Sequence, residues 1–158
     1  RAAILAYFGD LWPVHNRGFL AILIECRRHF GGDLDQMLIL TLIGERTLTA
    51  QRAKGLSYQS FLAGERGEGA PRRINTQSIS DSTGIPRETV RRKLSALLER
   101  GWVRKDAGGS YLVTDQATVE LRPATETSFD YLVALGKAIS ALPEAGSGGE
   151  SRRLAGPK

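Results

Sequence analysis

The side chains best suited to chemistry lie in one short, strongly basic segment. Between Pro71 and Lys105 the sequence holds nine Lys or Arg residues and three Asp or Glu residues, whereas the rest of the 158-residue chain holds thirteen basic and fourteen acidic residues. This segment therefore accounts for the whole formal net charge of +5. Guanidinium and ammonium groups donate strong hydrogen bonds to phosphate oxygens, and arginine also pairs with base edges. A basic cluster that coincides with a folding motif indicates a polyanionic partner.

The spacing of residues 87–100 predicts a helix with one apolar and one polar face. At about 100° per residue, Val90, Leu94 and Leu97 share one side, with Leu98 at its edge. Helices that read the major groove present the residues of their first turns to base edges. We therefore predict two sets of DNA contacts: Arg87, Glu88, Thr89, Arg91 and Arg92 for base edges, and Thr76, Gln77, Lys93, Arg104 and Lys105 for phosphates or as part of a wing.

A recognisable series of elements positions these side chains. Asn75 or Thr76 begins a short helix, Gly84 permits a tight turn, and Pro86 suits the start of the second helix, which Gly101 ends. Residues 102–105 and 110–114 flank Asp-Ala-Gly-Gly, which predicts a β-hairpin. The predicted fold is therefore mainly α: a winged helix-turn-helix with a small β-hairpin wing, flanked by N- and C-terminal helices.

Residues 74–114 resemble the winged helix-turn-helix of bacterial transcription regulators. Residues 86–94 are similar to the recognition helix of the Crp/Fnr family, whose Arg-Glu-Thr-Val-x-Arg pattern falls on residues 87–92. The resemblance implies that Arg87, Glu88 and Arg92 contact bases or phosphates. Apolar helices precede the motif where Crp/Fnr proteins have a nucleotide-binding β-roll. Helices on both sides of a winged domain resemble the MarR-type layout instead, in which the outer helices form the dimer.

The flanking sequence predicts the remaining organisation. Apolar periodicity indicates helices over residues 17–30, from Leu34 to about Arg52 behind an Asp33 N-cap, and over 127–142. The expected parts are N-terminal dimerisation helices (1–52), a linker with a short helical piece at Tyr58–Leu62 (53–73), the winged domain (74–122), a C-terminal helix (123–142) and a flexible tail (143–158). The apolar surface of the outer helices exceeds what one small winged domain needs, so we expect a homodimer.

The composition also indicates whether the protein holds a disulfide, spans a membrane or carries a signal peptide. One cysteine, Cys26, precludes an internal disulfide, and no apolar run reaches the roughly 18 residues that a membrane helix needs. The opening residues lack the length and cleavage signature of a signal peptide, so a cytoplasmic protein is expected. The first residue is not methionine, which leaves open whether the natural chain extends beyond Arg1.

We therefore predict a sequence-specific double-stranded-DNA-binding transcription regulator, with no catalytic residue, metal or cofactor. One alternative is a winged domain that binds another protein and not DNA. The other is an enzyme, whose best candidate pairs Cys26 with His29 or His15, too few groups for a zinc site. A small-molecule effector stays open: Tyr7, Trp12, Phe19 and Phe30 fit either an effector pocket or ordinary core packing.

Overall fold

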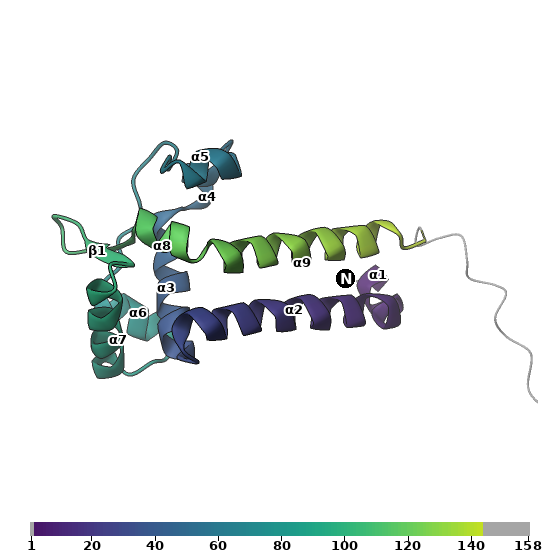
Figure 1. Cartoon of the computed structure of the whole chain (residues 1–158), viewed down its shortest axis with the longest axis horizontal. Helices are drawn as coiled ribbons and strands as arrows, with labels where there is room; N and C mark the ends of the chain where they lie inside the picture. Colours follow the sequence, from purple (N-terminus) through teal and green to yellow (C-terminus); the bar gives the residue numbers. More distant parts are fainter. Residues whose placement is uncertain (1, 144–158) are drawn as a thin grey trace, which may run out of the picture. The chain divides into compact units, whose positions relative to one another are not determined.

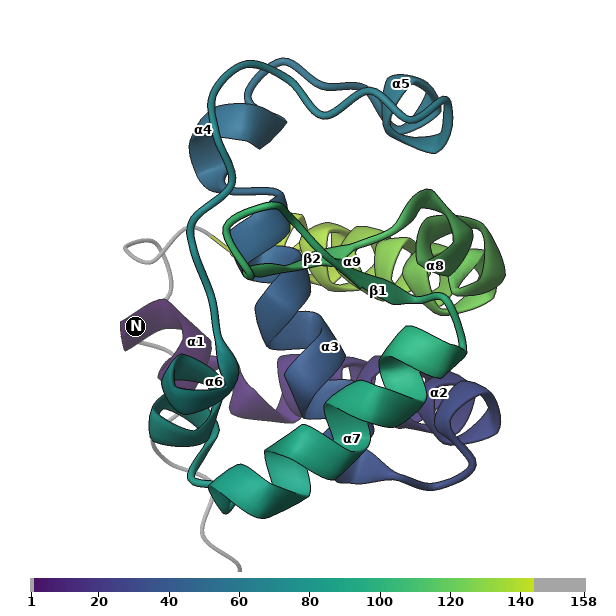
Figure 2. The same cartoon turned by 90° about the vertical axis from the view of Figure 1, so that its left-hand side faces the viewer.

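The computed structural model describes residues 2–143, so the predicted flexible tail lies, except for Pro143, outside the described residues. The chain divides into two compact units, one formed by residues 1–23 with the chain from 126 onward, and one formed by residues 24–125. We call them the terminal unit and the central unit. The elements, labelled in Figure 1 and Figure 2, are α1 (Ala2–Ala6), α2 (Phe8–Phe30), α3 (Leu34–Thr47), α4 (Ala50–Ala53), α5 (Tyr58–Leu62), α6 (Thr76–Thr83), α7 (Arg87–Glu99), β1 (Val103–Lys105), β2 (Tyr111–Val113), α8 (Asp115–Glu120) and α9 (Arg122–Ser140). The predicted fold class, mainly helical with a small two-stranded wing, is confirmed.

The core of the central unit lies where α3, α6 and α7 meet. Figure 2 shows α7 crossing in front of α3, with α6 beside it. Val90, Leu94 and Leu97 of α7 are fully buried, as the helical projection predicted. They pack with other fully buried side chains, namely Ile39, Ile43, Ile79 and Trp102. Each such side chain contributes about 1.5–3 kcal/mol by leaving water, so this contact fixes the position of α7.

Trp102 joins several parts of this core. Its ring meets Phe30 edge-on, with ring centroids 5.2 Å apart, and the Arg100 guanidinium lies 3.4 Å from its ring centroid. The indole Nε1 donates a hydrogen bond of 2.8 Å to Glu120 in α8. A buried tryptophan needs such an acceptor, so the end of α2, the end of α7 and α8 are held around one side chain.

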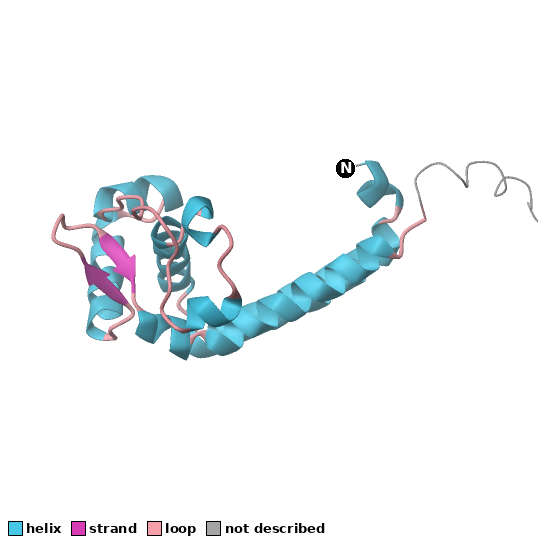
Figure 3. Ribbon diagram, turned by 90° about the horizontal axis from the view of Figure 1, so that it is seen from above, coloured by secondary structure: helices cyan, strands magenta, loops and turns pink. Residues whose placement is uncertain are grey.

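The wing is the predicted antiparallel hairpin. Val103 pairs with Val113, Arg104 with Leu112 and Lys105 with Tyr111. Figure 3 shows the two strands, which are joined by a short turn. The amide of Tyr111 also donates a hydrogen bond of 3.1 Å to the carbonyl of Ile74, so the residue that leads into α6 lies beside β2.

The helices flanking the motif are placed partly as predicted. Asp33 caps α3, with the Gln36 amide 3.0 Å from its Oδ1, and α5 lies at the predicted Tyr58–Leu62. The predicted extension of α3 to about Arg52 is wrong. The helix ends at Thr47, because Thr49 adopts an extended conformation and its hydroxyl accepts the Arg52 amide to start α4.

Two other boundaries also differ. Helix α2 begins at Phe8 and not Arg17, and its Pro13 lies within the second turn. The C-terminal helix α9 begins at Arg122, one residue before the predicted C-terminal helix (123–142) and five before the apolar periodicity that starts at residue 127. Its Pro123 lies in the first turn, where proline is tolerated. Helix α8 was not predicted; the Thr114 hydroxyl begins it by accepting the Ala117 amide at 3.2 Å.

The terminal unit pairs most of α2 with most of α9. The two segments run in opposite directions (Figure 1), and His15 Nδ1 lies 2.7 Å from the Tyr131 hydroxyl. Gly18 lies against Tyr131 so closely that an added Cβ would be 2.2 Å from a ring atom. Among the described residues of this unit, Leu11 is the one large hydrophobic side chain that is buried. Across residues 2–143, no helix is both long and apolar enough to cross a membrane.

Candidate nucleic-acid interface

The turn between α6 and α7 is fixed by local hydrogen bonds. At the start of α6, Asn75 Oδ1 accepts the Ser78 amide at 2.9 Å and Ser78 Oγ accepts the Asn75 amide at 3.2 Å. At its end, Gly84 adopts a φ of +73°, which side-chain-bearing residues rarely do. Ile85 is buried, and its carbonyl accepts the Ser80 hydroxyl at 2.7 Å. The chain therefore enters α7 at Pro86 in one defined direction.

The outer face of α7 carries the predicted base-reading residues. Arg87, Glu88, Arg91 and Arg92 are all exposed, and Thr89 is partly buried at the flank. The Arg91 guanidinium donates two hydrogen bonds to the Glu88 carboxylate, of 2.9 and 2.6 Å. These bonds lower the pKa of Glu88 and raise that of Arg91, so both groups are charged at neutral pH. The side chains of Glu88 and Arg91 are 74% and 69% exposed, and such an exposed pair exchanges readily for other partners.

Lys93 lies on a different side of α7. Its ammonium group bonds the carboxylate of Asp33, the N-cap of α3. Partial burial acts to raise the pKa of Asp33, but the bonds from Lys93 and from the Gln36 amide, with the charges of Lys93 and Arg92, lower it overall. Lys93 therefore ties α7 to α3, a role that the sequence analysis did not foresee for this predicted phosphate contact.

The two predicted contacts on α6 lie near its start. The Thr76 hydroxyl is 3.4 Å from the hydroxyl of Tyr111 on the wing, so it links the helix to β2. Gln77 is exposed, and its amide nitrogen donates to Asp81 one turn later at 2.7 Å. Gln77 therefore presents a polar group to solvent at the N-terminal end of a helix, where the helix dipole favours anions.

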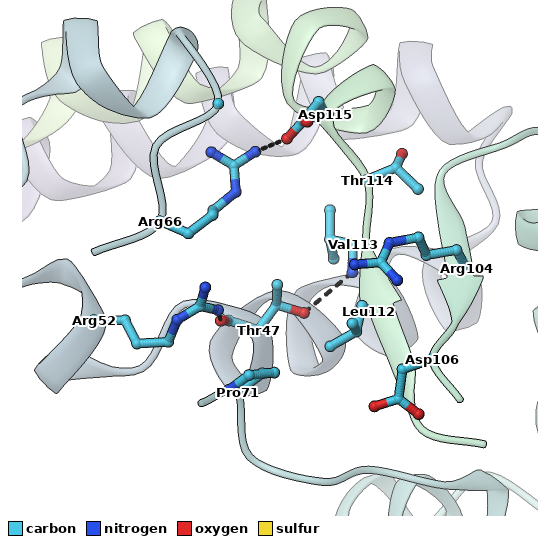
Figure 4. Close-up of a pocket in the computed structure, with 11 residues that line it drawn as sticks. Thr47, Arg52, Arg66, Pro71, Arg104, Asp106, Leu112, Val113, Thr114 and Asp115 are labelled. Atoms are coloured by element: carbon cyan, nitrogen blue, oxygen red, sulfur yellow. Dashed lines mark hydrogen bonds and ion pairs between the residues drawn. The ribbon is translucent and has the colours of Figure 1, made fainter. Parts of the chain in front are cut away.

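The wing separates its two basic residues, which the sequence analysis treated alike. Side chains alternate between the two faces of a strand, so Lys105 shares a face with its partner Tyr111, and Arg104 shares the other face with Leu112. The Lys105 ammonium lies 5.1 Å from the Tyr111 ring centroid. Arg104 instead lines a cavity together with Leu112 (Figure 4). The alternation of side chains along a strand would have been sufficient to predict, from the sequence, that Lys105 and Arg104 lie on opposite faces.

Arg73 belongs to the basic segment between Pro71 and Lys105, but it was not among the predicted DNA contacts. It is exposed, and its Nη2 lies 3.2 Å from the point that a Cβ on Gly108 would occupy, so its guanidinium lies against the wing turn. No local pattern predicts this position, because it depends on the hydrogen bond between Tyr111 and Ile74.

The groups considered for an enzyme have surroundings or partners in the structure that do not activate them for nucleophilic chemistry. Cys26 is partly buried, and this burial, with the nearby charge of Glu25, raises the pKa of its thiol and disfavours the nucleophilic thiolate. His15 bonds Tyr131, and the carbonyl of His29 accepts a hydrogen bond from Arg100 at 2.8 Å. Within residues 2–143, no three His, Cys, Asp or Glu side chains gather where they could hold a metal ion.

Comparison with known protein families gives a match to a helix-turn-helix domain. The pattern of the IclR helix-turn-helix domain matches residues 68–107, about a quarter of the chain, which span α6, the turn, α7 and β1. No curated protein and no solved structure matches the chain. The predicted resemblance to the Crp/Fnr and MarR families is not confirmed, since IclR is a different family. The Arg-Glu-Thr-Val pattern sets a buried and an exposed helix face, which any groove-reading helix needs, so it does not separate these families. The chain carries a winged helix-turn-helix of the DNA-binding kind found in transcription regulators.

Proposed function

We propose that this protein is a sequence-specific regulator of transcription that binds double-stranded DNA as a homodimer. The observation that carries the proposal is the division of α7 into a buried apolar face and an exposed charged face. Val90, Leu94 and Leu97 anchor one side in the core, while four charged residues, Arg87, Glu88, Arg91 and Arg92, are exposed on its first turns. A helix held so rigidly can place its N-terminal side chains at base edges in a major groove.

Within this face, the exposed residues take distinct roles. Arg87 and Arg92 make no hydrogen bond or ion pair with another described side chain, so each guanidinium is available for a bidentate contact with guanine. Glu88 and Arg91 orient one another, and each exchanges this bond for a base. Thr89 at the flank contacts a neighbouring base or its methyl group.

Phosphate contacts extend the interface on both sides of α7. Thr76 and Gln77 at the start of α6, and Lys105 and Arg73 at the wing, are the groups we assign to the backbone. Arg104 contributes positive charge from the other face of the wing. Lys93 is assigned a smaller part, because contact with a phosphate competes with its bond to Asp33.

The exposed apolar surface of the terminal unit supports the homodimer. Eleven of its large hydrophobic side chains are exposed: Ile4, Leu5, Phe8, Trp12, Phe19, Leu20, Leu23, Phe129, Leu132, Val133 and Ile139. Surfaces of this kind mark interaction sites, and closed two-fold pairing is the commonest way to cover them. Two recognition helices about one DNA turn apart then read a two-fold symmetric site, which one small domain lacks the contacts to specify.

The test is the salt dependence of binding to duplex DNA, first on oligonucleotides selected from a random pool. Each phosphate contact adds about 0.9 to the slope of log affinity against log salt, so a dimer with about six contacts loses on the order of a thousandfold between about 50 and 200 mM salt. Fluorescence anisotropy measures this slope. A flat profile, or a pool with no enriched sequence, would contradict the proposal.

A further inference from the structure

A cavity of about 530 Å³ lies behind the wing, on the side of β2 that carries Leu112 (Figure 4). Three arginines line it, from three separate segments: Arg52 from α4, Arg66 from the loop after α5 and Arg104 from β1. Two carboxylates, Asp106 and Asp115, also line it. Three cationic and two anionic groups leave one net positive charge, which suits a ligand that carries a single negative charge.

The hydrogen bonds of these groups show which donors are available. Arg66 is committed, because it bonds the carbonyls of Phe61 and Glu65, both at 2.9 Å, and the carboxylate of Asp115. The Thr47 hydroxyl is committed as well, since it donates to the Ile43 carbonyl at 2.8 Å and accepts the Val113 amide at 3.1 Å.

Two arginines retain unused donors. Arg52 bonds the Thr47 carbonyl through Nη1, but its Nε is buried and has no acceptor among the described residues. Arg104 makes no hydrogen bond or ion pair with any described side chain. A buried N–H without an acceptor costs free energy, and an anionic oxygen in the cavity would satisfy it.

A second cavity adjoins the first and is mainly apolar. It measures about 260 Å³ and shares Thr47, Arg66 and Val113 with the first. Its other lining residues include Leu48 and Phe61. A ligand that occupied both cavities would fill a volume within the range of small-molecule sites, about 300–1,000 Å³, with cationic groups at one end and apolar groups at the other.

We propose that these two cavities form a binding site for a small organic monocarboxylate. The carboxylate lies at Arg104 and Arg52, and the apolar part lies beside Leu48, Phe61 and Val113. A ligand here also neutralises Arg104, which is part of the wing. Because Arg104 adds charge from the other face of the wing, occupancy lowers the affinity for DNA by less than tenfold and reduces the salt slope by less than about 0.9, the contribution of one full phosphate contact. This regulatory step, unlike the binding site, rests on the proposed function.

Calorimetric titration of the full chain without DNA tests the site, with benzoate as the probe. We expect a dissociation constant on the order of 0.1–1 mM, as befits so small a ligand. Benzamide keeps the shape without the charge and acetate keeps the charge without the ring, so both should bind at least about tenfold more weakly. Arg104→Gln should weaken benzoate binding about tenfold, and it should fold because Arg104 is exposed. The matched control is Arg46→Gln, whose guanidinium bonds Glu45 at 3.0 Å and does not line the cavity.

The two parts of the proposal fail separately. Absence of saturable benzoate binding, equal binding of benzamide, or an unchanged affinity in Arg104→Gln would overturn the site, whatever the protein does with DNA. Binding of inorganic phosphate as tight as that of benzoate would overturn the organic-acid assignment. Saturating benzoate that leaves DNA affinity and salt slope unchanged would overturn the regulatory step. A protein that binds benzoate but no duplex DNA would contradict the proposed function and leave the site standing.

Discussion

The central and terminal units use hydrophobic residues in opposite ways. The central unit buries most of its large apolar side chains, with Ile39, Ile43 and Trp102 at 0% exposure, and leaves only a few exposed, among them Leu34 and Val119. In the terminal unit, Trp12 is 47% exposed and Leu132 is 58% exposed, and of the large described hydrophobic residues Leu11 alone is buried. One unit therefore closes its own core, and the other presents apolar surface whose burial requires a further partner. A central unit that buries its own core, in one chain with a terminal unit whose apolar surface needs a partner, is the organisation that our proposal of a homodimer requires.

The largest expected effect comes from placing charge on the terminal unit. Phe19→Glu combined with Leu132→Glu puts two carboxylates on the proposed pairing surface, where burial without partners is costly. We expect the mass from light scattering at micromolar concentration to fall from about twice to about once the 17.2 kDa of one chain. Affinity for a two-fold symmetric site should fall at least about a hundredfold, because each half-site must then be bound alone.

The matched control for this variant is Val119→Glu, since Val119 is 63% exposed but belongs to the central unit. It should leave both mass and affinity unchanged. If the parent protein already has the mass of one chain, with and without DNA, the homodimer is wrong and the winged domain acts alone.

Truncating one leucine in each unit sharpens the comparison. Leu94→Ala removes a side chain that is 1% exposed, and we expect it to lower the free energy of unfolding by about 2–5 kcal/mol. Urea denaturation should give this loss at every protein concentration. Leu132→Ala should instead lower stability only where the protein is associated, because a dimer interface stabilises by mass action. A loss independent of concentration for both variants would show that the units do not differ in this way.

Substitutions in the central unit should change DNA reading without changing assembly. Arg92→Ala is expected to cost about 1–3 kcal/mol on the preferred site and to relax selectivity at one base pair. Lys105→Ala should weaken binding to all sequences about equally and lower the salt slope by about one. Anisotropy titrations on the selected sequence and on single-base variants distinguish the two patterns. Equal weakening of every sequence by both variants would contradict the assignment of the α7 face.

Effects of opposite sign, the smaller of them the smallest in this series, are expected from one glycine in each unit. Gly18→Ala places a Cβ about where the Tyr131 ring lies, so we expect a loss of about 1–3 kcal/mol from overpacking. Gly44→Ala places its Cβ 3.9 Å from Val113, an ordinary contact, within α3. It should raise stability by about 0.5–1 kcal/mol, since alanine favours helix over glycine. Thermal unfolding measures both effects. Melting temperatures that shift in the same direction for the two variants would contradict this prediction.

The sequence predicted best what depends on near neighbours. Asn75, Gly84 and the three-and-four spacing of Val90, Leu94 and Leu97 act within a few residues, so the helix-turn-helix, its faces and the hairpin followed from them. The predicted base-reading residues are exposed on α7, but no observation tests their contact with DNA.

What the sequence did not predict depends on distant contacts or weak caps. Lys93 and Asp33 are 60 positions apart, so neither residue signals their bond. The same holds for Arg73 beside the wing turn, and for Phe30, which packs on Trp102 and so belongs to the core. The C-terminal end of α3 and the start of α8 depend on single threonine caps, Thr49 and Thr114, which many loop threonines resemble.

The placement of the two tryptophans has an optical consequence. Trp102 is fully enclosed and bonded to Glu120, whereas Trp12 is half exposed and stacks on Phe8, and these are the chain's two tryptophans. The fluorescence emission of the two tryptophans therefore reports on different changes in one sample. Removal of solvent from Trp12 shifts its emission to shorter wavelength, and entry of water to Trp102 shifts it to longer wavelength. With Trp12→Phe and Trp102→Phe as single-emitter variants, dilution and denaturation can be followed separately, without an added label.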